Sequence, residues 1–130
     1  MFTLKAIAAA HLKASSGKGF PEYIQAIKAI GVAGFETFVA DGHTQYFGTS
    51  NFTITSEALY NPLTIAASTD ADTFKKDLKS HQQGHTDFPT FCKDCAKSGI
   101  NKWVVLHDAM TCTYYDQAGA EVLVEKIPEL

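Results

Sequence analysis

The stretch Phe88-Pro89-Thr90-Phe91, continued to Tyr115, can be laid without a gap over Phe20-Pro21-Glu22-Tyr23, continued to Phe47. Few residues are identical, but the pattern of size and polarity is kept from end to end. The matched positions include Gly31 with Gly99, Val32 with Ile100, Phe35 with Trp103, Phe38 with Leu106 and Tyr46 with Tyr114. Self-similarity of this kind is the sequence signature of a repeated structural unit. We therefore expect an internal duplication, with pseudo-repeats at about residues 1–58 and 63–130.

The first expected repeat contains two helices followed by three strands. Apolar residues at helical spacing predict a helix from about Phe2 to Ala14, and Pro21 opens a second helix that Gly31 ends. Asp41-Gly42 between two apolar runs predicts a type I′ hairpin turn, in which both central residues have positive φ. The expected strands of this half cover residues 34–40, 43–48 and 52–55.

The second expected repeat follows the same order. The residues from Thr69 to Asp72 predict a helix start, and Gly84 is a plausible cap at the end of that helix. Phe88-Pro89 opens the next helix, which Gly99 closes. Gly42 of the first hairpin falls on Met110, so we expect the second turn to be built differently. The expected strands of this half cover residues 102–107, 111–116 and 120–126, with a short linking strand at 63–66.

These patterns together predict an α+β fold in a single domain, residues 1–130. A three-stranded meander has one apolar face that must be covered, and the two helices of its own repeat can cover it. Two such units can join edge to edge or pack face to face. We favour the first arrangement, an antiparallel sheet of about six strands with the helices packed on one side of it.

Composition narrows the classes of function. The chain has 130 residues, a net charge of −3 and no cluster of Lys and Arg, so the electrostatic footprint of a nucleic-acid-binding protein is missing. The apolar start, Phe2 to Leu12, is too short and too interrupted for a signal peptide or a membrane span. The odd number of cysteines, three, favours free thiols in a reducing compartment. We therefore expect a cytoplasmic protein that binds neither nucleic acid nor membrane.

Two histidines and two cysteines at short spacings, His81-x3-His85 and Cys92-x2-Cys95, suggest a zinc site. The repeat argues against it, because the two cysteines fall on Ile24 and Ile27, on the buried stripe of a helix. Free cysteine often behaves as a small buried apolar residue. We expect core cysteines, no metal and no cofactor.

Candidates for acid–base or nucleophilic chemistry are weak. His81 has a counterpart in His11 near the end of the first helix, and the pair could face a shared cleft. A histidine near the C-terminus of a helix is also favoured by the helix dipole alone. Pairs of Cys92 or Cys112 with His107 would be nucleophilic, but no turn of the type that presents a nucleophile accompanies them. We therefore assign no catalytic residue.

Short motifs across the chain carry a family resemblance. They are Gly31-Val32, Tyr46-Phe47-Gly48, His81-Gln82-Gln83-Gly84-His85-Thr86-Asp87-Phe88, Phe91-Cys92, Ala96-x-x-Gly99-Ile100-x-Lys102-Trp103, Met110-Thr111-Cys112-Thr113-Tyr114-Tyr115-Asp116 and Glu125-x-Ile127-Pro128. With them the chain resembles a family of small uncharacterised bacterial and prophage proteins often labelled phage envelope protein. The resemblance implies no enzyme activity and no cofactor. The residues on its motifs that we expect at a ligand site are His81, Gln82, Asp87, Cys92 and Tyr114.

Two hypotheses about function follow. The first is a non-enzymatic cytoplasmic binding or interaction module of prophage or accessory-gene type, with a homodimer and a small-molecule ligand as its expected partners. The alternative is a small enzyme or ligand sensor with a groove lined by His and Cys between the two repeats. A role in the virion is a third idea. The sequence names no ligand, reaction or strand order.

Overall fold

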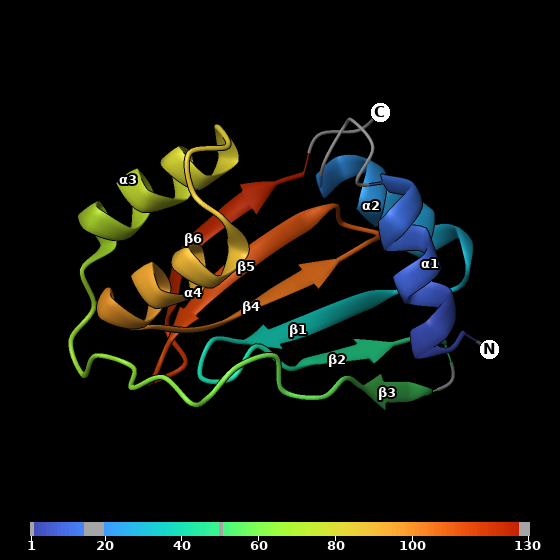
Figure 1. The fold of residues 1–130 in the computed structure, drawn as a ribbon, viewed down its shortest axis with the longest axis horizontal. Coiled ribbons are helices and arrows are strands. Elements are labelled where there is room, and N and C mark those ends of the chain that lie inside the picture. Colours follow the sequence, from blue (N-terminus) through green and yellow to red (C-terminus); the bar gives the residue numbers. More distant parts are fainter. Residues whose placement is uncertain (1, 15–19, 50, 128–130) are drawn as a thin grey trace.

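The computed structural model describes residues 2–14, 20–49 and 51–127 of the chain. Within these residues the chain forms two helices, then three strands, and then repeats that order (Figure 1). The elements are α1 (Leu4–Ala14), α2 (Phe20–Ala29), β1 (Gly34–Phe38), β2 (Thr44–Phe47), β3 (Thr53–Thr55), α3 (Ala71–Gln82), α4 (Phe88–Lys97), β4 (Ile100–Leu106), β5 (Thr111–Asp116) and β6 (Glu121–Lys126).

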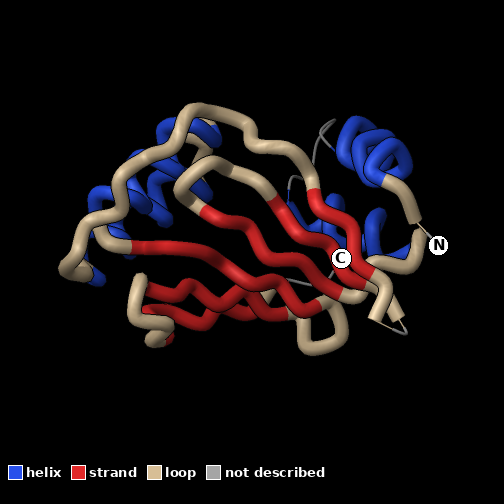
Figure 2. The backbone as a smooth tube through the Cα atoms, turned by 90° about the horizontal axis from the view of Figure 1, so that it is seen from below, coloured by secondary structure: helices blue, strands red, loops and turns tan. Residues whose placement is uncertain are grey.

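The strands form one sheet in the order β3-β2-β1-β4-β5-β6, and every neighbouring pair is antiparallel. The helices form two pairs, α1 with α2 and α3 with α4, near opposite ends of the sheet (Figure 1). Seen from below, both pairs lie on the same side of the strands (Figure 2). The α+β fold with a six-stranded antiparallel sheet is therefore confirmed, and the face-to-face arrangement is wrong.

Local chemistry sets the ends of the helices in the second half. Asp70 and Asp87 are the N-caps of α3 and α4, and their carboxylates accept hydrogen bonds from the backbone N–H groups of Thr73 and Thr90 at 3.1 and 2.9 Å. An N-cap side chain satisfies one of the backbone donors that a helix start leaves without a partner. Residues with positive φ follow both helix ends, as expected from the sequence.

The two faces of the sheet differ. On the helix-covered face, alternate strand residues are buried, among them Phe35, Trp103, Val105, Cys112 and Tyr114. They form one core with the apolar side chains of the four helices. The opposite face carries no helix, and we call it the open face (Figure 2). This division suits an antiparallel sheet, in which side chains alternate between a buried and a solvated face.

The two halves share their strand register. Phe35 pairs with Tyr46, and Trp103 pairs with Tyr114, the residues that the alignment of the two stretches places at the same positions. All four β1–β2 pairs correspond in this way to β4–β5 pairs. Glu36 pairs across the centre of the sheet with Val104, its own counterpart in the alignment. This agreement is what a duplication would produce, and the duplication itself stays a prediction.

Two expectations about turns are wrong. In the first hairpin only Gly42 has positive φ (77°), so the turn is not of type I′. It is a longer loop, in which the N–H of Gly42 donates to the carbonyl of Phe38 at 2.8 Å and that of Phe38 to the carbonyl of His43 at 3.0 Å. Met110, aligned with Gly42, also has positive φ (51°). The second turn, which was expected to differ because it has no glycine, therefore has the same left-handed conformation at this position.

The expected linking strand at residues 63–66 is also wrong, because this segment is irregular. Its backbone N–H groups bond outside the sheet: Leu63 donates to the carbonyl of Ala40 at 2.6 Å, and Ala66 donates to the carbonyl of Ala96 at 2.8 Å. The segment thus connects the β1–β2 turn to the end of α4. Among the residues that the structure describes, none of the helices has the length and apolarity needed to span a bilayer.

Candidate functional site

The ligand candidates taken from the resemblance all lie in the second half of the chain. His81 is in the last turn of α3 and is half-buried. Its ring stacks on Phe91 with 4.4 Å between centroids and 10° between planes. Its Nδ1 lies 3.0 Å from the carbonyl oxygen of Thr86 and 3.1 Å from the hydroxyl of the same residue. These contacts hold the imidazole against the end of the helix.

Gln82 and Asp87 are exposed, and both have structural partners. The side-chain amide of Gln82 donates to the carboxylate of Glu125 at 3.0 Å, which ties the end of α3 to β6. The carboxylate of Asp87 caps α4, and the hydrogen bonds from Thr90 hold the pKa of Asp87 below its ordinary value. Asp87 therefore serves the start of α4.

Cys92 on α4 and Tyr114 on β5 are both buried. Cys92 is fully buried, burial raises the pKa of its thiol, and it interacts with the hydroxyl of Tyr60. Burial also raises the pKa of Tyr114, whose ring packs 4.9 Å from that of Phe74 and 6.1 Å from that of Trp103. Neither side chain is available to a ligand without a rearrangement of the core.

His81 and Tyr114 belong to one aromatic cluster between the second helix pair and the sheet. Its rings are those of Phe74, His81, Phe88, Phe91, Trp103 and Tyr114. Ring centroids 4.4 to 6.5 Å apart, in stacked, tilted and edge-on pairs, are typical of aromatic core packing. The cluster brings two of the five candidates together as packing residues. A ligand site built from all five stays a prediction.

The cysteines of the zinc pattern, Cys92 and Cys95, are both fully buried on α4, as Ile24 and Ile27 are on α2. The prediction of core cysteines is therefore confirmed. No group of three or more His, Cys, Asp or Glu side chains in the described part of the chain could hold a metal ion.

The proposed nucleophilic pairs with His107 find no support in the geometry. Burial raises the pKa of the Cys112 thiol to about 12, so the nucleophilic thiolate is suppressed at neutral pH. His107 is itself fully buried, and its Nδ1–H donates to the carbonyl of Val32 at 2.5 Å. The side chain of His11, the proposed counterpart of His81, lies outside the described residues.

The open face carries a row of interacting side chains that runs from the β1–β2 loop across strands β1, β4 and β5. His43 stacks on Phe38 with 4.5 Å between centroids, and the Nζ of Lys102 lies 5.8 Å from the centroid of Phe38 and 5.5 Å from that of Tyr115. Lys102 also forms an ion pair with Glu36 at 2.5 Å. Each residue of the row neighbours the next across paired strands.

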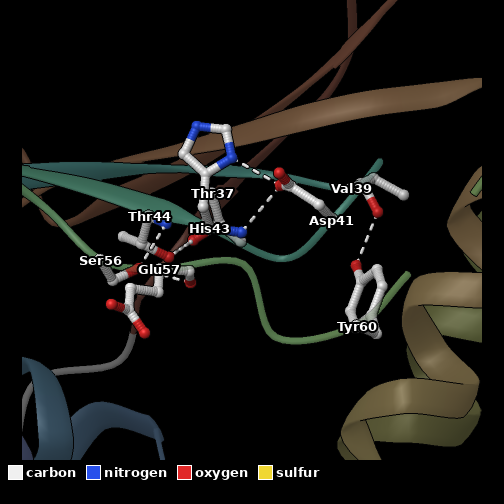
Figure 3. A network of polar contacts seen from close by, with 8 residues as sticks. All are labelled: Thr37, Val39, Asp41, His43, Thr44, Ser56, Glu57 and Tyr60. Carbon is white, nitrogen blue, oxygen red and sulfur yellow. Dashed lines mark hydrogen bonds and ion pairs between the residues drawn. The ribbon is translucent and has the colours of Figure 1, made fainter. Parts of the chain in front are cut away.

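An Asp–His pair stands at one end of this row. The Nδ1 of His43 lies 2.5 Å from the Oδ1 of Asp41, and the backbone N–H of His43 donates to the same oxygen at 3.0 Å (Figure 3). These bonds hold the pKa of Asp41 below its ordinary value, with the backbone bond as the larger cause. Sequence reasoning treated Asp41 only as a turn residue and missed His43. The Asp-x-His spacing at the hairpin was the available signal.

The residues around the pair fix the loop that carries it. The hydroxyl of Tyr60 donates to the carbonyl of Val39 at 2.6 Å, and the hydroxyls of Thr37 and Thr44 lie 2.9 Å apart at the base of the hairpin (Figure 3). The side chain of Ser56 accepts a hydrogen bond from the N–H of Thr44 at 2.8 Å. The loop is therefore tied to the segment that follows β3.

Comparison with known proteins also finds a family without a known function, as the resemblance in the sequence implied. A family described as "Protein of unknown function (DUF1398)" matches residues 8–126. No curated protein matches the chain. The match covers all six strands and nearly all of the helical residues. The chain therefore belongs to the DUF1398 family, a protein family of unknown function.

Proposed function

We propose that the protein is a binding module that pairs with a second copy of itself through the open face of its sheet. The observation that carries this proposal is the exposure of two large apolar side chains in the strands of that face, Leu106 at 45% and Val124 at 52%. An antiparallel sheet with one solvated face normally carries polar side chains on that face, and these two apolar side chains depart from that pattern.

The apolar residues of the open face are contiguous. Thr113 pairs with Val104 on one side and with Val124 on the other, and it is only 9% exposed although no helix covers it. The side chains of Val104 and Val124 therefore shield Thr113 from solvent. Leu106 lies two residues from Val104 along β4, on the same face. Contiguous exposed apolar side chains of this kind mark interaction surfaces.

The charges of the open face suit a protein partner. The ion pair of Glu36 and Lys102 is close to the centre, and its members neutralise each other. Unpaired charges, such as that of Glu121, stand at the edge strand. Charge depletion in the middle with a polar rim is the usual anatomy of a protein–protein interface. A two-fold dimer is the commonest assembly that uses the same patch on both copies.

The experiment is sedimentation velocity over a range of protein concentrations, with Val124→Lys as the variant. Wild-type protein is expected to dimerise. Because each dimer loses two buried valines, Val124→Lys should raise the dissociation constant by about 100-fold or more. Leu59→Lys is the matched control, since Leu59 is 64% exposed in the loop after β3 and should leave the dimer unchanged. A wild-type protein that stays monomeric at hundreds of micromolar would contradict the proposal.

Three expectations from the sequence stay part of this proposal. Composition predicts a cytoplasmic location and no binding of nucleic acid, and the resemblance implies an origin in prophage or accessory genes. The net charge of −3 supports the expected lack of nucleic-acid binding. The alternative of an enzyme or sensor with a groove lined by His and Cys has no support from the cysteines, because Cys92, Cys95 and Cys112 are all buried.

A further inference from the structure

The imidazole of His43 is held more firmly than the turn requires. The turn closes through backbone bonds, and the N–H of His43 donates to the carboxylate of Asp41 whatever the side chain at position 43. The ring adds a second bond to that carboxylate at 2.5 Å and stacks on Phe38 within 10° of parallel. Two independent contacts therefore fix the orientation of the ring.

This orientation determines which ring nitrogen can react. Because the carboxylate accepts a hydrogen bond from Nδ1–H, the neutral ring carries its lone pair on Nε2. Figure 3 shows Nε2 on the side of the ring away from Asp41. No described residue forms a hydrogen bond with it. With 32% of the side chain of His43 and 30% of that of Asp41 exposed, water can reach Nε2.

The charges nearby indicate the class of substrate. Asp41 is an anion next to the ring, and the cation of Lys102 is already paired with Glu36. A negatively charged substrate would be repelled, whereas an uncharged one would not be.

We propose that His43, oriented by Asp41, is a general base for the hydrolysis of uncharged esters at this end of the open face. Nε2 takes a proton from water as the water oxygen bonds to the ester carbonyl carbon. The carbonyl then re-forms, the bond to the alcohol oxygen breaks, and the imidazolium returns the proton to that oxygen. The ester and the water thus become a carboxylic acid and an alcohol. The Nδ1–H group of His43 stays hydrogen-bonded to the carboxylate of Asp41 throughout.

The test uses the full chain with p-nitrophenyl acetate and measures the release of p-nitrophenolate. His43→Asn should lower kcat/KM by about 100-fold, the low end of general-base contributions. Imidazole added to His43→Ala should restore the rate above the reaction of imidazole in buffer alone. The control His85→Asn removes an exposed histidine outside the pair and should leave the rate unchanged. Thermal melts verify that each variant folds.

The variant Asp41→Asn tests whether Asp41 acts by orienting the ring of His43 or only by holding the turn together. Asparagine can still accept the hydrogen bond from the backbone N–H of His43, so the turn is kept, but the charge that selects the Nδ1–H tautomer is lost. We expect kcat to fall about tenfold with KM unchanged, and Asp41→Glu to recover part of the loss.

A wild-type rate in the His43→Asn variant would overturn the proposal. If that variant does not fold, a wild-type rate in Asp41→Asn overturns it equally. The dimer is measured by sedimentation and the hydrolysis by release of p-nitrophenolate, so this proposal and the dimer fail separately.

Discussion

At the scale of single residues, His107 is the buried group whose chemistry is least expected from the sequence. It occupies the position of Val39 in the first half, and both residues are fully buried. Their backbones make the same contact: the N–H of Val39 donates to the carbonyl of Asn101, and that of His107 to the carbonyl of Ala33, both at 2.9 Å. The imidazole adds a bond to Val32, while its Nε2 has no partner among the described residues.

We expect His107 to make the protein less stable in mild acid. Burial lowers the pKa of His107 below its ordinary value, although the bond to Val32 acts in the opposite direction. The unfolded chain therefore takes up a proton, as pH falls below about 6.5, before the folded chain does. The contribution of His107 to stability is complete above that pH and is lost as pH falls toward the folded-state pKa.

The measurement is the free energy of unfolding in urea between pH 7 and pH 5. The slope due to one such group is at most about 1.4 kcal/mol per pH unit. His107→Gln, which can still donate to Val32 but does not titrate, should reduce the slope. His85→Asn, which removes an exposed histidine, should not. An unchanged slope in His107→Gln would show that His107 has the same proton affinity in both states.

At the scale of elements, helix ends were predictable and loops were not. Capping depends on residues within one turn of the helix end, so Asp70, Asp87 and the glycines after the helices can be recognised in the sequence. The hairpin turn depends on its length and on contacts from elsewhere, such as Tyr60 against Gly42. The Asp41–His43 pair was missed for the same reason, because the ring is positioned by Phe38 on the neighbouring strand.

Two helix-ending glycines should respond differently to the same substitution. Gly84 after α3 and Gly99 after α4 have nearly equal φ values, +83° and +81°. A Cβ at Gly84 would meet nothing within 4 Å, whereas a Cβ at Gly99 would lie 2.6 Å from the carbonyl oxygen of Ser68. Gly84→Ala should therefore cost only the strain of the left-handed backbone, about 1 kcal/mol. Gly99→Ala should cost about 2–3 kcal/mol, because a backbone oxygen must also move.

Urea unfolding of the two variants checks this expectation, and Gly84→Ala is the matched control for backbone strain. Equal losses of stability would mean that the loop around Ser68 moves away from the new methyl group at little cost. That loop carries the N–H of Asp70, which bonds to the carbonyl of Ser98 at 3.0 Å. The larger loss in Gly99→Ala would thus measure how firmly the start of α3 is joined to the end of α4.

At the scale of the whole molecule, the sequence predicted the content of each half but not the strand order. Alternation of apolar and polar residues tells which face of a strand is buried, not which strand lies beside it. The order in the structure places β1 and β4, one strand from each half, side by side at the centre. The core is consequently continuous between the halves, and neither half has a sheet edge at that junction.

This central pairing leads to a prediction about cooperativity. Five residue pairs join β1 to β4, from Gly34 with Leu106 to Phe38 with Lys102, and His107 bonds across the halves to Val32. We therefore expect the two halves to unfold together in a single transition. The only tryptophan of the chain, Trp103, lies in the second half within the aromatic cluster, so its fluorescence reports on that half. Far-UV circular dichroism reports on the helices of both.

Urea unfolding followed by the two signals should give the same midpoint and the same slope, as two-state behaviour requires. A fluorescence midpoint different from that of circular dichroism would show that one half unfolds while the other persists. Glu36→Pro sharpens the test, because proline removes a backbone donor from the central strand β1 and is poorly tolerated inside a sheet. If the β1–β4 junction couples the halves, this change in the first half should lower the midpoint of the Trp103 signal as much as that of circular dichroism.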